Sequence, residues 1–125
     1  MKQLFSRKWF ISILAIFAAW FGWQYVYATT NLTWTAPTTN TDGSPLTDLG
    51  SYRVYRGNSS GGAKTLLATV TAPVTAYQDS STLEGLNCYA ITAVDLDGNE
   101  SNYSNEACKF VDTIAPNAPT GLIVN

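Results

Sequence analysis

The sequence predicts an all-β fold, a small β-sandwich, for the part of the chain that follows residue 28. Short strand-like runs recur along 29–112, and clusters of Gly, Pro, Asn, Asp and Ser separate them, as in a sandwich or barrel. The stretch NCYAITAVDLDGNESNYSNEAC reads as a β-hairpin, because Cys88 and Cys108 are equidistant from Gly98 in its turn. Two antiparallel strands folded about Gly98 would bring the two thiols face to face.

The first 28 residues have the pattern of a secretory signal peptide. Lys2, Arg7 and Lys8 make a basic start with no acidic residue. An apolar run over 9–21 follows, and small or apolar residues up to Ala28 place the expected cut after that residue. The exported remainder would be secreted, or held at the cell surface or in the envelope.

The same segment also fits an uncleaved membrane anchor. Residues 9–28 contain only Ser12 and Gln24 as polar side chains apart from Trp and Tyr. A hydrophobic helix of this length is long enough to span a bilayer. Contact with a membrane is expected only in that case, and the remainder is exported in both.

The charge and the missing histidines exclude several kinds of function. Residues 29–125 carry four basic side chains against nine acidic ones, a net charge of −5, which argues against nucleic acid and anionic membranes as partners. The sequence has no histidine, so it offers no Cys/His zinc site and no Ser-His or Cys-His pair. We therefore expect no cofactor, no metal and no enzymatic activity. In an exported domain the two cysteines favour a disulfide over a metal site or a catalytic thiol.

The first two strands are expected on either side of a polar loop. In 32–35 apolar residues alternate with threonine, and Pro37 ends the run. The loop after it turns at Asp42-Gly43. The run YRVYR at 52–56 has the clearest alternation in the chain and is expected to be the next strand.

Two further strands follow a glycine-rich turn at 57–62. The run 65–70 is rich in Thr, Leu and Val, and Pro73 ends it. A short strand at 76–78 comes next. We expect Asp79-Ser80-Ser81 to close that strand as a turn.

The last two strands, 89–93 and about 104–111, form the hairpin. By alternation Cys88 lies on the opposite face to Tyr89 and Ile91, so the disulfide should sit on the outer face. One inward face of a sandwich can be assembled from Leu32, Trp34, Tyr52, Val54, Leu66, Tyr77, Tyr89, Ile91 and Ala93.

Three segments together resemble a fibronectin type III domain of the bacterial sort, an immunoglobulin-like β-sandwich. They are LTWTAP at 32–37, DGSPLTDLGSYRVYRG at 42–57 and YAITAVDLDGNESNYSNEA at 89–107. The resemblance covers nearly all of residues 30–112. It implies a domain at 29–112 in which Trp34, Tyr52 and Val54 are core residues. The cysteine pair is similar to a variant found in bacterial members.

This resemblance implies a non-catalytic module with a structural, spacer or adhesion role. A carbohydrate- or protein-binding accessory module is the alternative. Tyr55 and Tyr103, on outward faces, are candidates for sugar binding, although a lone outward tyrosine more often packs against its cross-strand neighbour. The Asp95-Leu-Asp97-Gly98-Asn99-Glu100 segment is read as a hairpin turn rather than a calcium loop, because the further ligands of such a loop are absent.

Two departures from the family pattern stand out. Asn87 occupies a position where the family often has a tyrosine, so the junction before that strand is expected to be irregular. The family's first strand is also missing, because only Thr29 and Thr30 precede the Trp34 strand after the expected cut.

Residues 113–125 resemble a family linker followed by a first strand. This tail is read in three ways: as a remnant without a role, as a strand that folds back on its own domain, or as a strand that completes a neighbouring molecule. Joining Asn125 to Thr29 gives APTGLIVN-TTNLTWTAP, close to a normal first-to-second-strand sequence. In the third reading residues 119–124, with Leu122, Ile123 and Val124, would link copies of the chain head to tail into a filament.

Overall fold

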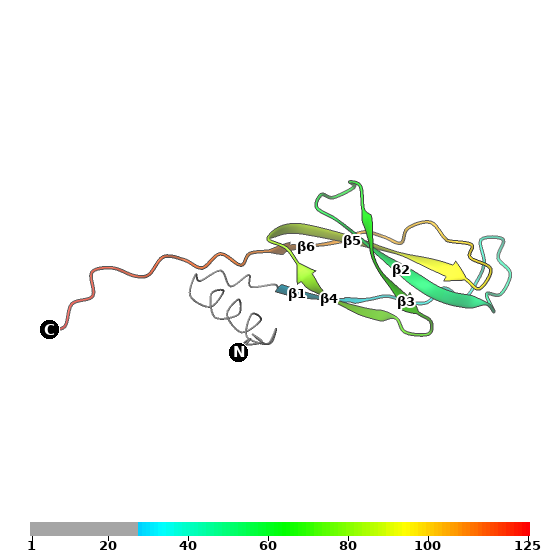
Figure 1. Ribbon diagram of the computed structural model, residues 1–125, viewed down its shortest axis with the longest axis horizontal. Helices are drawn as coiled ribbons and strands as arrows, with labels where there is room; N and C mark the ends of the chain where they lie inside the picture. The colour runs from blue at the N-terminus through cyan, green and yellow to red at the C-terminus, as the bar shows by residue number, and fades with distance from the viewer. Residues whose placement is uncertain (1–27) are drawn as a thin grey trace, which may run out of the picture.

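The computed structural model describes residues 28–125, and these residues form six strands in two antiparallel sheets (Figure 1). The predicted signal peptide or anchor lies outside the described residues, apart from Ala28. The strands are β1 (Ala28–Thr33), β2 (Leu49–Gly57), β3 (Thr65–Thr71), β4 (Ala76–Thr82), β5 (Gly85–Asp95) and β6 (Ala107–Val111). No helix in this part of the chain is long and apolar enough to cross a membrane.

The two sheets differ in size. Within residues 28–125, β1 pairs with β4 alone, and the other sheet has the order β3-β2-β5-β6. The predicted all-β sandwich is confirmed, and each predicted strand has a counterpart. In the hairpin β5 and β6 place Cys88 directly opposite Cys108, as expected from their equal distances to Gly98.

The last strand is shorter than predicted, because serine side chains replace part of its backbone ladder. Ala93 N donates to Ser101 Oγ at 2.9 Å and Ile91 N donates to Ser104 Oγ at 3.0 Å. The amides of Ser101 and Ser104 return hydrogen bonds to the carbonyls of Ala93 and Ile91. The segment before Ala107 therefore follows β5 without being a regular strand.

The core is smaller than the predicted inward face. Tyr52, Val54 and Tyr89 are buried. The other predicted positions, Leu66 excepted, are only half-buried: Leu32, Trp34, Tyr77, Ile91 and Ala93. Four of these five line a groove at the edge of β1 or the hollow beside it, described below, and no other part of residues 28–125 covers them there.

The prediction that Leu66 faces the core is wrong, since its side chain is 54% exposed. The register between β2 and β3 shifts between Val54 and Tyr55, so that Val54 pairs with Ala68 but Tyr55 pairs with Leu66. An extra residue at such a β-bulge reverses the alternation along the strand. Leu66 consequently shares the outer face with Tyr55.

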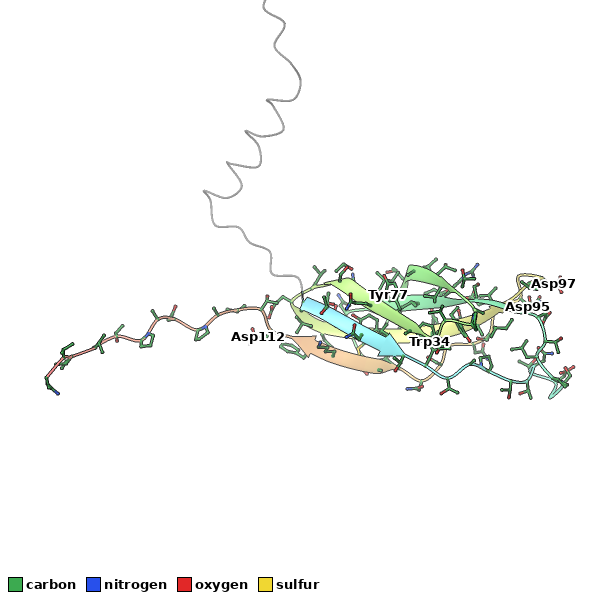
Figure 2. The ribbon with its side chains drawn as sticks, turned by 90° about the horizontal axis from the view of Figure 1, so that it is seen from below. Trp34, Tyr77, Asp95, Asp97 and Asp112 are labelled. Carbon is green, nitrogen blue, oxygen red and sulfur yellow. A yellow bond between two sulfur atoms is a disulfide. The ribbon has the colours of Figure 1, made fainter. Side chains whose placement is uncertain are left out.

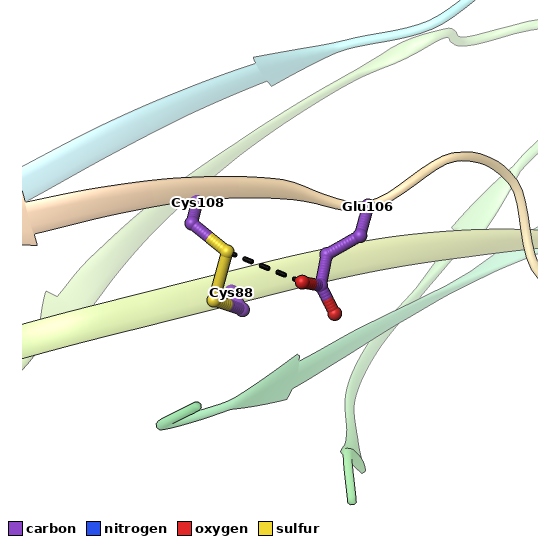
Figure 3. A group of neighbouring side chains, drawn as sticks. All are labelled: Cys88, Glu106 and Cys108. Carbon is purple, nitrogen blue, oxygen red and sulfur yellow. Dashed lines mark hydrogen bonds between the residues drawn. A yellow bond between two sulfur atoms is a disulfide. The ribbon is translucent and has the colours of Figure 1, made fainter. Parts of the chain in front are cut away.

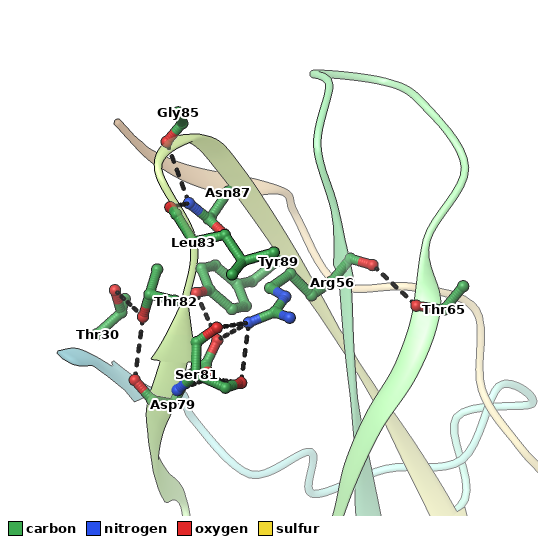
Figure 4. Close-up of polar contacts among 10 residues, drawn as sticks. All are labelled: Thr30, Arg56, Thr65, Asp79, Ser81, Thr82, Leu83, Gly85, Asn87 and Tyr89. Atoms are coloured by element: carbon green, nitrogen blue, oxygen red, sulfur yellow. Dashed lines mark hydrogen bonds and ion pairs between the residues drawn. The ribbon is translucent and has the colours of Figure 1, made fainter. Parts of the chain in front are cut away.

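A buried carboxylate ties the two sheets together (Figure 4). Asp79 in β4 is fully buried, and its Oδ2 accepts hydrogen bonds from Arg56 of β2 at 2.6 Å and from the Tyr89 hydroxyl of β5 at 2.9 Å. Its Oδ1 accepts from the amide and hydroxyl of Ser81. Burial raises the pKa of Asp79, but the hydrogen bonds together lower it by more, so the net pKa lies below its ordinary value.

The expectation that Asp79-Ser80-Ser81 forms a turn is wrong, because these residues continue β4.

The side chain of Asn87 holds the junction between β4 and β5, which is an irregular bend at residues 83 and 84. The buried Asn87 side chain donates its amide hydrogens to the carbonyls of Leu83 at 2.9 Å and Gly85 at 3.1 Å. In these hydrogen bonds a side chain donates to backbone carbonyls of residues just upstream. The hydroxyl of a corner tyrosine makes a similar bond to the upstream backbone in immunoglobulin-like sandwiches. Asn87 therefore closes the corner in place of a tyrosine.

Replacing Asn87 by alanine should lower the free energy of unfolding by about 1–3 kcal/mol, because it leaves two carbonyls at the corner without their donor. Urea denaturation followed by circular dichroism measures the change. Asn105→Ala is the matched control, because Asn105 is exposed and its change should stay within about 0.5 kcal/mol. Equal effects of the two substitutions would contradict this role of Asn87.

Candidate functional site

The main candidate site is an open groove along the free edge of β1. The groove has a volume of about 560 Å³ and lies between β1, β5 and residues 104–107. A hollow of about 220 Å³ adjoins it and continues past Trp34. Among the described residues that line these two spaces none is charged, and the main ones are Leu32, Trp34, Tyr89, Ile91, Ser104 and Ala107.

Among residues 28–125, the backbone of β1 has no partner strand on the side of this groove. The amide of Trp34 donates to Thr75 O at 3.1 Å, on the β4 side. By alternation the main-chain groups of Asn31 and Thr33 point to the opposite, open side. At the start of the strand, Lys109 Nζ of β6 donates to Thr29 O at 3.1 Å and so covers that end of the edge. Two residues of β1 are left as a template for another strand.

Two buried polar atoms lie at the groove without a partner among residues 28–125. They are the indole Nε1 of Trp34 and the hydroxyl of Tyr52. The two rings pack edge to face, with centroids 5.1 Å apart, and both line the smaller hollow. A buried donor without an acceptor costs free energy, so these two groups lower the stability of the domain beside the hollow.

Residues 119–124, the predicted assembly strand, are exposed and form no regular strand in this structure, and Gly121 has φ +73°. The tail beyond Asp112 runs away from the pole at which β6 ends and β1 begins (Figures 1 and 2). Leu122 is 94% exposed, Ile123 77% and Val124 91%. The tail touches the domain at its root, where the amide and hydroxyl of Thr113 donate to Glu84.

The outward tyrosines lie together on the outer face of the larger sheet. Tyr55 and Tyr103 pack edge to face with centroids 5.0 Å apart, and Tyr103 is 52% exposed. Glu100 accepts hydrogen bonds from Arg53, from the Tyr55 hydroxyl and from Thr92. These bonds, that from Tyr55 first, lower the pKa of Glu100. The cluster therefore exposes one aromatic ring, that of Tyr103, beside an ion pair.

The Asp95–Glu100 segment is the turn that the sequence predicted. Asp95 Oδ1 accepts from the amides of Asp97 at 3.0 Å and Asn99 at 2.8 Å, and its Oδ2 accepts from the Asn99 side chain at 2.8 Å. These hydrogen bonds, with Asn99 as the main donor, lower the pKa of Asp95. Gly98 has φ +90°, a conformation that suits glycine in such a turn. Both oxygens of Asp95 are thus committed to the turn itself, at the pole opposite the tail (Figure 2).

Cys88 and Cys108 form the predicted disulfide (Figure 3). Tyr89 points toward β4, so the neighbouring Cys88 lies on the outer face of its sheet, but its side chain is fully buried. The carboxylate of Glu106 contacts Cys108 Sγ at 3.4 Å; this sulfur carries no hydrogen, so the contact is not a hydrogen bond. Since the two sulfurs bond each other, neither is a thiolate ligand for a metal.

Glu106 also fixes the turn before β3. It pairs with Lys64 and accepts hydrogen bonds from the Ser60 hydroxyl at 2.9 Å and the Gly61 amide at 3.0 Å. The bond from Lys64, followed by those from Gly61 and Ser60, lowers the pKa of Glu106 from 4.5 to about 2. The turn at 57–62 is thereby held next to the disulfide.

This lowered pKa gives the stability of the domain a pH dependence. The folded state favours ionised Glu106, so its contribution is full above pH 4.5 and is lost as the pH falls toward 2. Glu106→Gln should therefore flatten the dependence of the urea midpoint on pH between about 5 and 2. Glu84→Gln is the control, and an unchanged slope in Glu106→Gln would contradict the assignment.

Comparisons with known proteins support the resemblance to fibronectin type III (Fn3) domains. No family model matches the sequence. A stretch of 57 residues is 46% identical to an amylopullulanase of Thermoanaerobacter thermohydrosulfuricus and spans 45% of this chain but 4% of that enzyme. A β-1,2-glucanase from Parabacteroides distasonis has the same fold over 70% of this chain and 11% of its own, with 24% identity and a TM-score of 0.53.

A more complete match is an Fn3-like protein from Clostridium thermocellum. It is 29% identical, has a TM-score of 0.54, and the alignment covers 74% of this chain and 86% of that one. The chain therefore carries a fibronectin type III-like β-sandwich domain, whose last two strands are joined by the Cys88–Cys108 disulfide.

Proposed function

We propose that this chain is an exported, non-catalytic Fn3 module with a structural, spacer or adhesion role in the degradation of polysaccharides outside the cell. The observation that carries this is the 46% identity to a stretch that makes up a small part of an amylopullulanase. A region with the same fold is also a small part of a β-1,2-glucanase. The disulfide supports an oxidising compartment, and hence a secreted or cell-envelope location.

The same proposal includes self-association. The exposed apolar side chains of residues 119–124 and the unpaired edge of β1 support head-to-tail assembly by strand donation. A spacer that assembles in this way would hold its attached partners at regular intervals.

A carbohydrate-binding accessory module is the second candidate. The half-exposed ring of Tyr103 favours it, because sugars stack on exposed aromatic faces. Against it, the partner ring of Tyr55 is half-buried and its hydroxyl is bonded to Glu100, so a single ring is available.

Two assays on the full chain separate these candidates. A spacer should bind no member of a glycan array that includes β-1,2-glucan, and should release no reducing ends from polysaccharides. Glycan binding that Tyr103→Ala abolishes, with Leu66→Ala as the exposed apolar control, would establish the accessory module instead. Hydrolysis by the purified chain would overturn both the spacer and the accessory module.

Cell fractionation and N-terminal sequencing test export. A chain that starts at Thr29 has been cut, and one that starts at Met1 has kept its hydrophobic segment.

A further inference from the structure

We propose that the groove along β1 is the acceptor site for residues 120–124 of a second copy of this chain. The inference rests on the assembly part of the proposed function and names its binding site. It requires an open edge, a groove of suitable chemistry, and a strand that arrives in the right direction.

The open edge supplies backbone hydrogen bonds. Between the end covered by Lys109 and the end of the strand, the main-chain groups of Asn31 and Thr33 have no partner among residues 28–125. An incoming strand can pair antiparallel to β1 and extend the two-stranded sheet to three strands.

The groove suits an uncharged, apolar strand. Within the described chain no charged side chain lines the groove or its adjoining hollow. A strand laid beside β1 would cover the half-buried Ile91.

The tail has the matching chemistry. Residues 113–125, TIAPNAPTGLIVN, contain no charged side chain. In an extended strand Leu122 and Val124 share one face, and both are more than nine-tenths exposed in the isolated chain. Insertion of these two side chains would bury them against Leu32 and Ile91, and Ile123 would lie on the opposite face.

Direction selects a second copy over the tail's own domain. β1 runs away from the pole where β6 ends, and the tail leaves from that pole (Figure 2). A strand antiparallel to β1 must enter from the opposite pole. The tail of an identically oriented neighbour arrives there, whereas a tail folded back onto its own β1 would run parallel to it. Pro116 and Pro119 favour an extended linker between β6 and the donated strand. The contact is heterologous and does not close, so it yields linear assemblies.

Sedimentation velocity of the full chain over a range of concentrations tests the donor side. The wild type should form a ladder of oligomers, and Leu122→Asp with Val124→Asp should weaken association by at least about 100-fold, since two carboxylates would enter an apolar groove. Ile114→Asp is the matched control: Ile114 is 75% exposed and lies outside the donated strand, so this variant should associate like the wild type.

The acceptor side is tested by Thr33→Pro against Thr33→Ala. Proline removes the amide that points to the open edge and leaves the bonds to β4 in place, so Thr33→Pro should abolish assembly while Thr33→Ala retains it. If Thr33→Pro does not fold by circular dichroism, a synthetic peptide of residues 113–125 replaces this arm. Added in excess to wild-type oligomers, the peptide should dissociate them. The same peptide with Leu122→Asp and Val124→Asp should leave them intact.

Two results would overturn the proposal. A wild type that stays monomeric at the highest concentration reached means that no second copy occupies the groove. Oligomers that survive the two aspartate substitutions use another surface. Neither result affects the spacer role, which the glycan and hydrolysis assays test separately.

Discussion

Asp79→Ala should lower the free energy of unfolding by about 3 kcal/mol. Asp79 is fully buried and accepts four hydrogen bonds, from Arg56, Tyr89 and both polar groups of Ser81. Its removal leaves the Arg56 guanidinium and the Tyr89 hydroxyl without their acceptor at the interface of the two sheets. The Arg56 side chain keeps 21% of its surface in solvent and still donates to Ser81. The expected loss of free energy is therefore at the lower end of the range for removing one partner of a buried ion pair. Guanidinium denaturation at neutral pH measures it.

The control for Asp79 is Asp42→Ala. Asp42 also bonds a serine two residues on, with its Oδ1 2.9 Å from Ser44 N and 2.6 Å from Ser44 Oγ, but it is exposed. Its removal should cost less than about 1 kcal/mol. If Asp79→Ala and Asp42→Ala lower the free energy of unfolding equally, the contacts of Asp79 with the other sheet contribute nothing beyond its local bonds to Ser81. Arg56→Met combined with Asp79→Ala completes a double-mutant cycle that isolates the ion pair.

The sequence predicted the features that depend on local pattern. Alternating runs located six strands, and the turn chemistry around Gly98 placed Cys88 opposite Cys108. The Trp34 strand also indicated an uncovered edge, because no family-like first strand precedes it. In the part of the chain that the structure describes, β4 is the one strand paired with β1.

Features that depend on contacts between distant segments were not predicted. Asp79 follows a short apolar run and looks like a turn residue, since its partner Arg56 lies 23 positions away. Leu66 fits the alternation of its own strand, and only the register shift against β2 turns it outward. The unpartnered Trp34 indole and Tyr52 hydroxyl likewise emerge only when the two sheets are in place. Local periodicity carries none of this information.

Loss of the disulfide should also cost about 3 kcal/mol, the chain-entropy value for a loop of this size. Cys88 and Cys108 are separated by 20 positions and join β5 to β6. β6 pairs only with β5 and is mostly exposed, with Val111 its buried residue, so the disulfide is a main constraint on the last strand. Cys88→Ala with Cys108→Ala, compared in urea with the oxidised wild type, measures the loss. Reduction of the wild type should reproduce it without a change of side-chain volume.

The same variant tests whether the disulfide supports assembly. The tail leaves directly after β6, so a donated strand transmits load from one copy through β6 and the disulfide to β5 of its own domain. Without the disulfide β6 can separate from β5, since few other contacts hold it, and Lys109 would release the start of the neighbouring β1 edge. Association should then weaken even in samples with the same folded fraction, and more so for longer oligomers. Asn87→Ala, which acts on the β4–β5 corner instead, is the control at matched stability. Association equal to that of the control would restrict the disulfide to stabilising the single domain.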